Sequence, residues 1–424
     1  MFQGMSPAKQ LIDDLGRKAV KAAHRLAVCS TEAKNEALEA MANALEKQIS
    51  DIVTANDRDM YAGKEGGLSE AMLDRLKLNE KRISSMAQGL REVAALPDPV
   101  GEVIKEWTRP NGLRFRKVRV PLGVVGIIFE SRPNVTADAA SLCLKAGNAC
   151  ILRGGSEAIH SNIAIAKILN ETTARHGIPD HSIQMVEVTD REVVKAMARA
   201  DQYLACIVPR GGYGLIRAIQ EGATVPVIKH LEGICHVYVD KDADLEMARR
   251  VTINAKCQRP GVCNAMETLL VHSDVAGEFL PPLLKDLQAR KVEVRGDEHV
   301  RRIGGGSVIP VTEKDFRTEW LDLILSIRIV DSLDEAVKHI NTYGSHHSDS
   351  IITRDSKSAK AFLDEVDSST VYHNASTRFT DGGEFGLGAE IGISTDRLHA
   401  RGPMALEELT TYKYQVFGDG QIRE

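Results

Sequence analysis

The chain has 424 residues, with 54 Lys and Arg against 59 Asp and Glu and a formal net charge of −5. Its basic residues are interspersed with acidic ones, which excludes the basic blocks of a nucleic-acid-binding protein. No apolar run reaches membrane-spanning length and no cleavable leader is evident, so we expect a cytoplasmic protein, away from membranes, that acts on small molecules. The seven cysteines have no regular spacing, so we expect neither a disulfide framework nor a bound metal ion.

The first hundred residues are predicted to be helical. Apolar residues recur at steps of three and four over residues 38–52 and again over 83–93, which is typical of helices that bury one face. The residues LPDP at 96–99 interrupt this pattern. Apolar and basic residues then alternate over 105–121 around an Asn-Gly pair, which predicts two strands joined by a tight turn.

From residue 124 onward, short apolar runs alternate with segments of helix length. Uninterrupted Val, Ile and Leu are typical of strands that are buried on both faces, and the alternation indicates a parallel sheet in a nucleotide-binding α/β domain. The predicted strands are VVGIIF (124–129), ACILR (149–153), IQMVE (183–187), LACIV (204–208) and VPVIK (225–229).

A second α/β series begins near residue 240. It starts with a predicted helix over residues 242–257. The strands predicted after it are METLLV (266–271), ILSIRIV (324–330), SIITR (350–354) and STVYH (369–373). The sequence therefore predicts two α/β domains that join near residue 238.

Two glycine turns are candidates for binding a phosphorylated cofactor, although no G-x-G-x-x-G follows a predicted strand. The first turn contains Arg153, Gly154 and Ser156, and the second contains Arg210 and Gly211. Glycine allows close approach of a ligand, a helix N-terminus attracts phosphate, and Arg adds paired hydrogen bonds. Either turn, taken alone, could instead be only a tight connection between a strand and a helix. Both follow predicted strands at the edge where open α/β sheets bind ligands, which favours a cofactor.

One cysteine is a candidate nucleophile. Most cysteines lie among apolar neighbours and are expected to pack as small hydrophobic residues. In CQRPGVC, however, Cys257 ends a predicted helix and Cys263 follows a turn just before a predicted strand. Backbone N–H groups at such a junction can stabilise a thiolate or a nearby oxyanion, so Cys263 is favoured over simple packing. Arg259 is a source of positive potential there, or else an ordinary surface residue.

Four longer stretches are similar to one family of enzymes. They are PLGVVGIIFESRPNVTADAASLCLKAGNACILRGGSEA (121–158), QRPGVCNAMETLLVH (258–272), NASTRFTDGGEFGLGAEIGIST (374–395) and RGPMALEELTTYKY (401–414). In these stretches, and in order from about residue 7 to 418, the chain resembles the gamma-glutamyl phosphate reductases, a branch of the aldehyde dehydrogenase superfamily. The resemblance implies an α/β fold with a Rossmann-like cofactor domain, an α/β catalytic domain and a small β bridging element.

The resemblance also implies where these parts lie. An NADP(H)-binding domain would comprise residues 1–104 and 122–236, and a catalytic domain would comprise 237–400. The bridging and oligomerisation element would combine residues 105–121 with 401–424. In the superfamily this element adds strands to a neighbouring subunit, so we expect a homo-oligomer, at least a dimer; an exposed strand edge is a physical reason for such pairing.

The catalytic pair is carried over residue by residue. Cys263 matches the superfamily's catalytic cysteine. Asn134, in SRPNV, matches the asparagine whose side-chain amide forms the oxyanion hole together with the backbone N–H of the cysteine. Glu232 lies close to where oxidising relatives carry a water-activating glutamate, but the Glu-Leu-Gly-Gly pattern is broken, which fits the reductase branch.

The cofactor residues follow from the same comparison. Arg153 stands where wider aldehyde dehydrogenases carry a lysine, and Ser156 and Glu157 follow on the adenosine-ribose side. An Arg there favours the 2′-phosphate of NADPH over NADH. Glu319 falls where relatives hold the nicotinamide ribose, although the rest of that motif is not matched.

The implied reaction is the NADPH-dependent reduction of L-glutamyl 5-phosphate to L-glutamate 5-semialdehyde and phosphate through a cysteine thioester, the second step of proline biosynthesis from glutamate. Candidates for holding the substrate are Arg132, Arg259, Asn374 and Arg378, with His347 as a further candidate. Association with glutamate 5-kinase would protect the labile acyl phosphate. The alternatives are an oxidising or CoA-acylating aldehyde dehydrogenase, or an inert scaffold of the same fold.

Overall fold

The computed structural model describes residues 6–423. Contacts divide the chain into two compact units. Unit 1 comprises the chain up to Lys229, Gly386–Gly392 and the chain from Pro403 onward, and unit 2 comprises His230–Phe385 and Ile393–Gly402. Each unit has its own hydrophobic core. Among the described residues, no helix combines the length and the apolar character that crossing a membrane requires.

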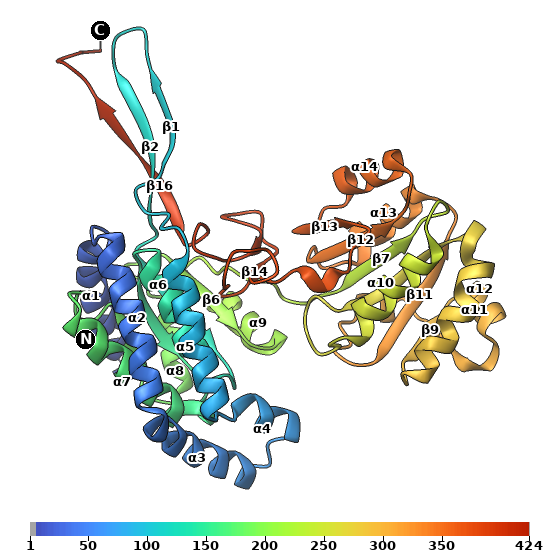
Figure 1. Ribbon diagram of the computed structural model, residues 1–424, viewed down its shortest axis with the longest axis horizontal. Helices are drawn as coiled ribbons and strands as arrows, with labels where there is room; N and C mark the ends of the chain where they lie inside the picture. The colour runs from blue at the N-terminus through green and yellow to red at the C-terminus, as the bar shows by residue number, and fades with distance from the viewer. Residues whose placement is uncertain (1–5, 424) are drawn as a thin grey trace, which may run out of the picture. The chain divides into compact units, whose positions relative to one another are not determined.

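Helices form the first part of unit 1, as the spacing of apolar residues predicts (Figure 1). Several begin after a Ser or Asn whose side chain accepts a backbone N–H of the first turn. The stripe predicted over residues 38–52 is shared by two helices, because α2 ends at Lys47 and α3 begins at Ile49. The helices are α1 (Pro7–Leu26), α2 (Thr31–Lys47), α3 (Ile49–Glu65), α4 (Glu70–Leu76) and α5 (Glu80–Ala95).

A parallel sheet in the order β5-β4-β3-β6 lies at the centre of unit 1. Its strands are β3 (Val124–Phe129), β4 (Ala149–Arg153), β5 (Ile183–Met185) and β6 (Cys206–Arg210), and β3 and β4 have the predicted bounds. The strands are connected by α6 (Val135–Lys145), α7 (Ile159–Arg175) and α8 (Arg191–Ala198), and α9 (Tyr213–Gly222) follows β6.

The strand predicted at residues 225–229 is wrong. This segment makes an isolated bridge between Val227 and Ile207 of β6. Pro226 accepts a hydrogen bond from the N–H of Ile207 but has no N–H of its own to continue the ladder.

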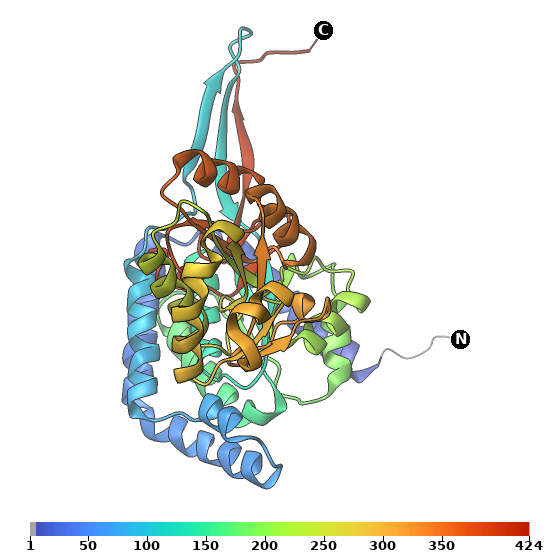
Figure 2. The ribbon, with the colours of Figure 1, turned by 90° about the vertical axis from the view of Figure 1, so that its right-hand side faces the viewer.

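Residues from both ends of the chain form a three-stranded antiparallel sheet in the order β1-β2-β16. Its strands are β1 (Val103–Thr108), β2 (Arg114–Pro121) and β16 (Thr410–Phe417). The predicted hairpin is confirmed, and Gly112 of its Asn-Gly pair has a φ of 85°, which favours glycine. In two views at right angles, this sheet projects from the helices of unit 1 (Figures 1 and 2).

Unit 2 contains a seven-stranded parallel sheet in the order β10-β9-β11-β8-β7-β12-β13. Its strands are β7 (Cys235–Val239), β8 (Met266–His272), β9 (Glu293–Gly296), β10 (Val308–Pro310), β11 (Ile324–Val330), β12 (Ser348–Ile352) and β13 (Thr370–His373). The helices between them are α10 (Leu245–Cys257), α11 (Ser273–Ala289), α12 (Glu298–Gly304), α13 (Leu333–Tyr343) and α14 (Ser356–Glu365). The four strands predicted here are present as β8, β11, β12 and β13.

Candidate active site

The loop that carries Cys263 joins α10 to β8 and is fixed at both ends. Lys256, in the last turn of α10, donates to Glu267 on β8 over 2.6 Å, and both side chains are almost completely buried. Burial raises the pKa of Glu267 to about 7, although the charge of Lys256 opposes this rise. Next to the cysteine, Asn264 donates to the carbonyl of Thr380 over 2.9 Å. These contacts hold the loop in one conformation.

The main chain of Cys263 is packed against the segment that leads into β7. A Cβ atom added at Gly233 would lie 1.8 Å from the carbonyl oxygen of Cys263, so only glycine allows this approach. The thiol of Cys235 donates to the same carbonyl over 3.2 Å. Glu319 accepts the N–H of Gly233 over 2.9 Å, and burial raises the pKa of Glu319. The carboxylate of Glu319 therefore helps to position the segment against which the cysteine rests.

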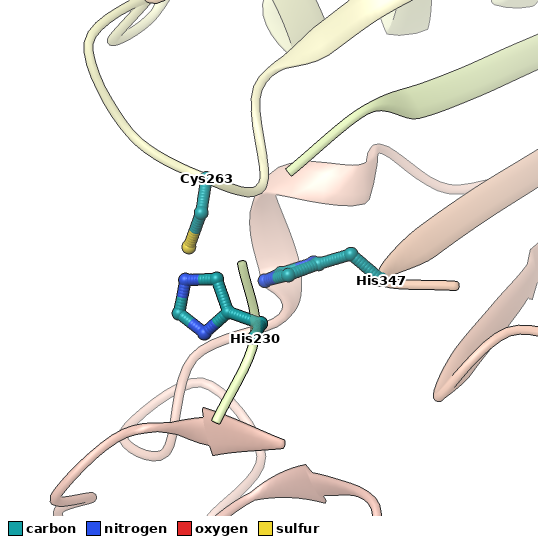
Figure 3. A group of neighbouring side chains, drawn as sticks. All are labelled: His230, Cys263 and His347. Carbon is teal, nitrogen blue, oxygen red and sulfur yellow. The ribbon is translucent and has the colours of Figure 1, made fainter. Parts of the chain in front are cut away.

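Two histidines lie beside the sulfur of Cys263, as Figure 3 shows. One ligand atom each from His230, Cys263 and His347 lie within 4.8 Å of one another. The three residues precede β7, β8 and β12, which are neighbours in the parallel sheet, so the cluster lies at the amino ends of these strands. His347 was a candidate from the sequence, whereas His230 was missed. No local motif distinguishes His230.

The predicted substrate residues of unit 2 have different surroundings. Arg378 donates to Gln258 over 2.9 Å, at the start of the cysteine's loop, and burial together with the nearby charge of Arg259 lowers the pKa of Arg378. Arg259 itself is exposed on this loop. Asn374 has a φ of 59°, and its amide accepts the N–H of Thr353 and donates to the carbonyl of Thr353. Substrate binding by these three residues stays a prediction.

In unit 1, the first glycine turn leads from the end of β4 through a short 3-10 turn (Ser156–Ala158) into α7. Arg153 is buried and donates to the carbonyl of Thr189 over 3.1 Å, and burial lowers its pKa. Its Nε has no partner among the described residues. A Cβ at Gly154 would lie 2.0 Å from Nδ2 of Asn162. Ser156 is exposed.

The remaining candidates of unit 1 lie in the 3-10 turn after β4, at the end of β6 and on the segment after β3. Glu157 accepts the N–H and the hydroxyl of Ser131 over 2.6 and 2.7 Å. Arg210 ends β6, and a Cβ at Gly211 would lie 2.6 Å from a carboxylate oxygen of Glu130. Arg132 is half-buried on the segment between β3 and α6.

The amide of Asn134 is oriented by its own helix. Asn134 stands at the N-cap position of α6 and donates to Asp138, one turn further along, over 2.8 Å. Burial raises the pKa of Asp138 to about 6, and the hydrogen bond from Asn134 opposes this rise. Because an amide NH2 group has two hydrogens, one remains for another acceptor when the other is held by Asp138.

The model of the aldehyde dehydrogenase family matches residues 6–316, and the chain belongs to this family. The family and the α/β fold predicted from the sequence are therefore confirmed.

Within that family, the chain is similar to several gamma-glutamyl phosphate reductases. The one from Moorella thermoacetica is 60% identical, covering 96% of this chain and 98% of its own. The one from Heliobacterium modesticaldum is 58% identical, with the same coverage. The crystal structure of the one from Thermotoga maritima has a TM-score of 0.96 at 49% identity and covers 97% of this chain and 100% of its own.

More distant structures share the fold. An engineered glycolyl-CoA reductase with bound NADP+ has a TM-score of 0.68 at 16% identity, covering 96% of each chain. This likeness concerns the fold alone.

Proposed function

We propose that the protein reduces L-glutamyl 5-phosphate to L-glutamate 5-semialdehyde and phosphate, with NADPH as the reductant. The similarity to gamma-glutamyl phosphate reductases over almost the whole chain supports this reaction. The observation that carries it is the fixed position of Cys263: its carbonyl lies against Gly233 and Cys235, and its loop is anchored at both ends. A cysteine held in this way can present its sulfur repeatedly to an electrophilic carbon.

In the proposed mechanism, the thiolate of Cys263 attacks the acyl carbon of the substrate. The oxyanion that forms is stabilised by the side-chain amide of Asn134 and the backbone N–H of Cys263, each contributing about 3 kcal/mol. The C–O bond to phosphate breaks and leaves a thioester on Cys263. Bound at the two glycine turns of unit 1, NADPH would supply the hydride that reduces this thioester. The C–S bond then breaks, which releases the aldehyde and regenerates the thiolate.

Phosphate is a good leaving group, so the first step needs no strong acid. A base that activates water would be harmful, because hydrolysis of the thioester would waste the activated substrate. Glu319 accepts the N–H of Gly233, which supports a role in positioning the segment next to Cys263. This role is in addition to the proposed contact of Glu319 with the nicotinamide ribose. Arg132, Arg259, Asn374 and Arg378 remain the proposed contacts of the amino-acid end of the substrate.

The proposed NADPH site uses the two glycine turns of unit 1. Arg153, Gly154, Ser156 and Glu157 would hold the adenosine side, and Arg210 and Gly211 would line the second turn. The residues fit a phosphate group, because Arg153 keeps a buried Nε that no described residue satisfies. Replacing Arg153 by Ala should raise KM for NADPH by at least about tenfold, since a charged hydrogen bond contributes about 1.5–3 kcal/mol, and should change KM for NADH much less. Equal effects on both cofactors would contradict the assignment.

We also propose a homo-oligomer of at least two subunits that works in the cytoplasm, and association with glutamate 5-kinase. The β1-β2-β16 sheet supports the first of these proposals, because β1 and β16 are its outer strands and much of their surface is exposed. The measurement that checks the assembly is the molar mass in solution of the full chain and of a chain that ends before β16.

The reaction is tested in the reverse direction. Wild type should reduce NADP+ with glutamate 5-semialdehyde only when inorganic phosphate is present, and Cys263→Ala should abolish the turnover. Cys257→Ala is the matched control, because this cysteine ends α10, outside the cluster with the two histidines. Turnover without phosphate would indicate an oxidising dehydrogenase, and activity in Cys263→Ala would refute the mechanism.

A further inference from the structure

The two histidines beside Cys263 have no part in the mechanism above. They come from different segments of unit 2, His230 before β7 and His347 before β12. Their rings meet edge to face, with centroids 5.2 Å apart. Figure 3 shows the sulfur of Cys263 turned toward the ring of His230, with the ring of His347 beside it.

The hydrogen bonds of the two rings determine which nitrogen can bind a ligand. Nδ1 of His230 lies 2.8 Å from the carbonyl oxygen of Ile393. A carbonyl only accepts, so Nδ1 carries the proton and Nε2 of the neutral ring carries the lone pair. Nδ1 of His347 faces the hydroxyl of Ser348 over 2.9 Å. Its Nε2 is buried without a hydrogen-bond partner in the part of the chain that is described, and the residue has 0% exposure.

A buried ring nitrogen without a protein partner is available to bind a ligand, because buried polar groups are normally hydrogen-bonded or coordinated. The hydroxyl of Ser348 is in turn 2.6 Å from that of Thr380, which is 2.8 Å from that of Tyr372. Through Nδ1, this chain of hydroxyl groups fixes the orientation of the His347 ring. Metal-bound histidines have the same arrangement, in which the second nitrogen is fixed by a carbonyl or a hydroxyl.

We propose that Cys263, His230 and His347 form a site for Zn²⁺ that reversibly blocks the nucleophile. A thiolate and two neutral imidazoles are ligands that Zn²⁺ prefers, and the fourth position would be left to water. Zinc bonds of about 2.3 Å to sulfur and about 2.0 Å to nitrogen require ligand atoms about 3.5 Å apart. The three ligand atoms are already within 4.8 Å of one another, so small side-chain rotations complete the site.

Binding converts the thiol to a zinc thiolate, and the displaced proton passes to solvent. No oxidation or reduction takes place, so removal of the ion makes the sulfur of Cys263 available again. Because the sulfur's reactive lone pair is then used by the metal, attack on an acyl phosphate is prevented. The proposal that Zn²⁺ inhibits the enzyme rests on the proposed function, whereas the proposal that Cys263, His230 and His347 bind Zn²⁺ does not.

The test measures Zn²⁺ binding directly, by competition with a chromophoric chelator. Wild type should bind one ion per chain, and Cys263→Ala, His230→Asn and His347→Asn should each weaken binding by at least about tenfold, since even a residue that only hydrogen-bonds to a metal ligand contributes about 10–100-fold. His346→Asn is the matched control, because this neighbouring histidine contacts the carbonyl of Asp367 and lies outside the cluster. It should bind like wild type.

A second measurement uses wild type alone and does not depend on the folding of variants. Zn²⁺ should slow the alkylation of Cys263 by iodoacetamide at least tenfold, as followed by mass spectrometry, and should leave the alkylation of half-buried Cys257 unchanged; a chelator should restore the rate. Equal protection of both cysteines, or no binding by wild type, would refute the site.

The two proposals fail separately. A chain that binds Zn²⁺ through these residues but shows no phosphate-dependent turnover would overturn the proposed reaction and leave the metal site intact. A chain that turns over and binds Zn²⁺ at Cys263 without losing activity would overturn the inhibitory role.

Discussion

Replacing Gly233 by Ala tests how the structure holds its nucleophile. The new Cβ would lie 1.8 Å from the carbonyl oxygen of Cys263 and 2.5 Å from its carbonyl carbon and Cα. All three atoms belong to the main chain, so no side-chain rotation relieves the clash. The two segments must separate until the closest contact is at least 3.0 Å, the limit for real Cβ atoms. The change also disturbs the hydrogen bond from Gly233 to Glu319.

A displacement of about 1 Å at the reacting atoms lowers a catalysed rate by about 100-fold. We therefore expect kcat/KM of Gly233→Ala to fall by about this factor, measured as phosphate-dependent NADP+ reduction. Overpacking of this kind destabilises a protein by about 1–3 kcal/mol, which leaves most molecules folded. Urea unfolding checks this second figure.

The matched control is Gly261→Ala, in the same loop as the cysteine. Among the described residues, the nearest atom to a Cβ there would be the carbonyl oxygen of Leu321 at 3.6 Å, an ordinary contact. This variant should keep its activity within about threefold, because no main-chain movement is required. If Gly233→Ala were as active as Gly261→Ala, the close approach of Gly233 to Cys263 would not position the sulfur, and the reasoning would be refuted.

Two further predictions concern buried carboxyl groups. Glu267→Gln leaves the charge of Lys256 buried without its partner, so the free energy of unfolding should fall by about 3–5 kcal/mol; a loss below 1 kcal/mol in urea unfolding would contradict this. The pKa of Asp138 is raised to about 6, so the folded chain binds the carboxyl proton more tightly than the unfolded chain does. The stability that this proton contributes is complete below about pH 4 and is lost as the pH rises through 6. Asp138→Asn should therefore be more stable than wild type at about pH 8, by at most about 3 kcal/mol, with a smaller gain at about pH 5. A pH-independent difference would show that Asp138 is not the group responsible.

The sequence predicts strands best where side chains of one kind repeat without interruption. The mainly apolar runs at 124–129 and 149–153 have the bounds of β3 and β4, because a strand that is buried on both faces needs such a run. The three-residue β10 is the edge strand of its sheet, where fewer apolar side chains are required, and β9, with the sequence EVRG, is the strand next to it. Their pattern is too short to distinguish them from a loop.

The residues of the candidate site could also be predicted only where local features mark them. Cys263 could be selected from the sequence because its turn and the following strand are local features. His230 could not be selected, because it lies near the cysteine only when β7 lies between β8 and β12. The order of strands in a parallel sheet cannot be predicted from the sequence of one segment. The resemblance predicts that Glu319 holds the nicotinamide ribose, but its hydrogen bond to Gly233 depends on the tertiary fold.

The pairing of β16 with β2 has a consequence for synthesis on the ribosome. Thr410 pairs with Pro121 and Phe417 with Arg114. β2, which is synthesised early, therefore cannot pair with β16 until the end of the chain has been synthesised. Unit 2 lies almost entirely within His230–Phe385 and can fold while the tail of the chain is still being added. We therefore expect unit 1 to be begun first and completed last, and β2 to keep an open edge throughout translation of unit 2. The basic side chains of β2, among them Arg114, Arg116 and Arg119, would discourage nascent chains from joining edge to edge during that interval.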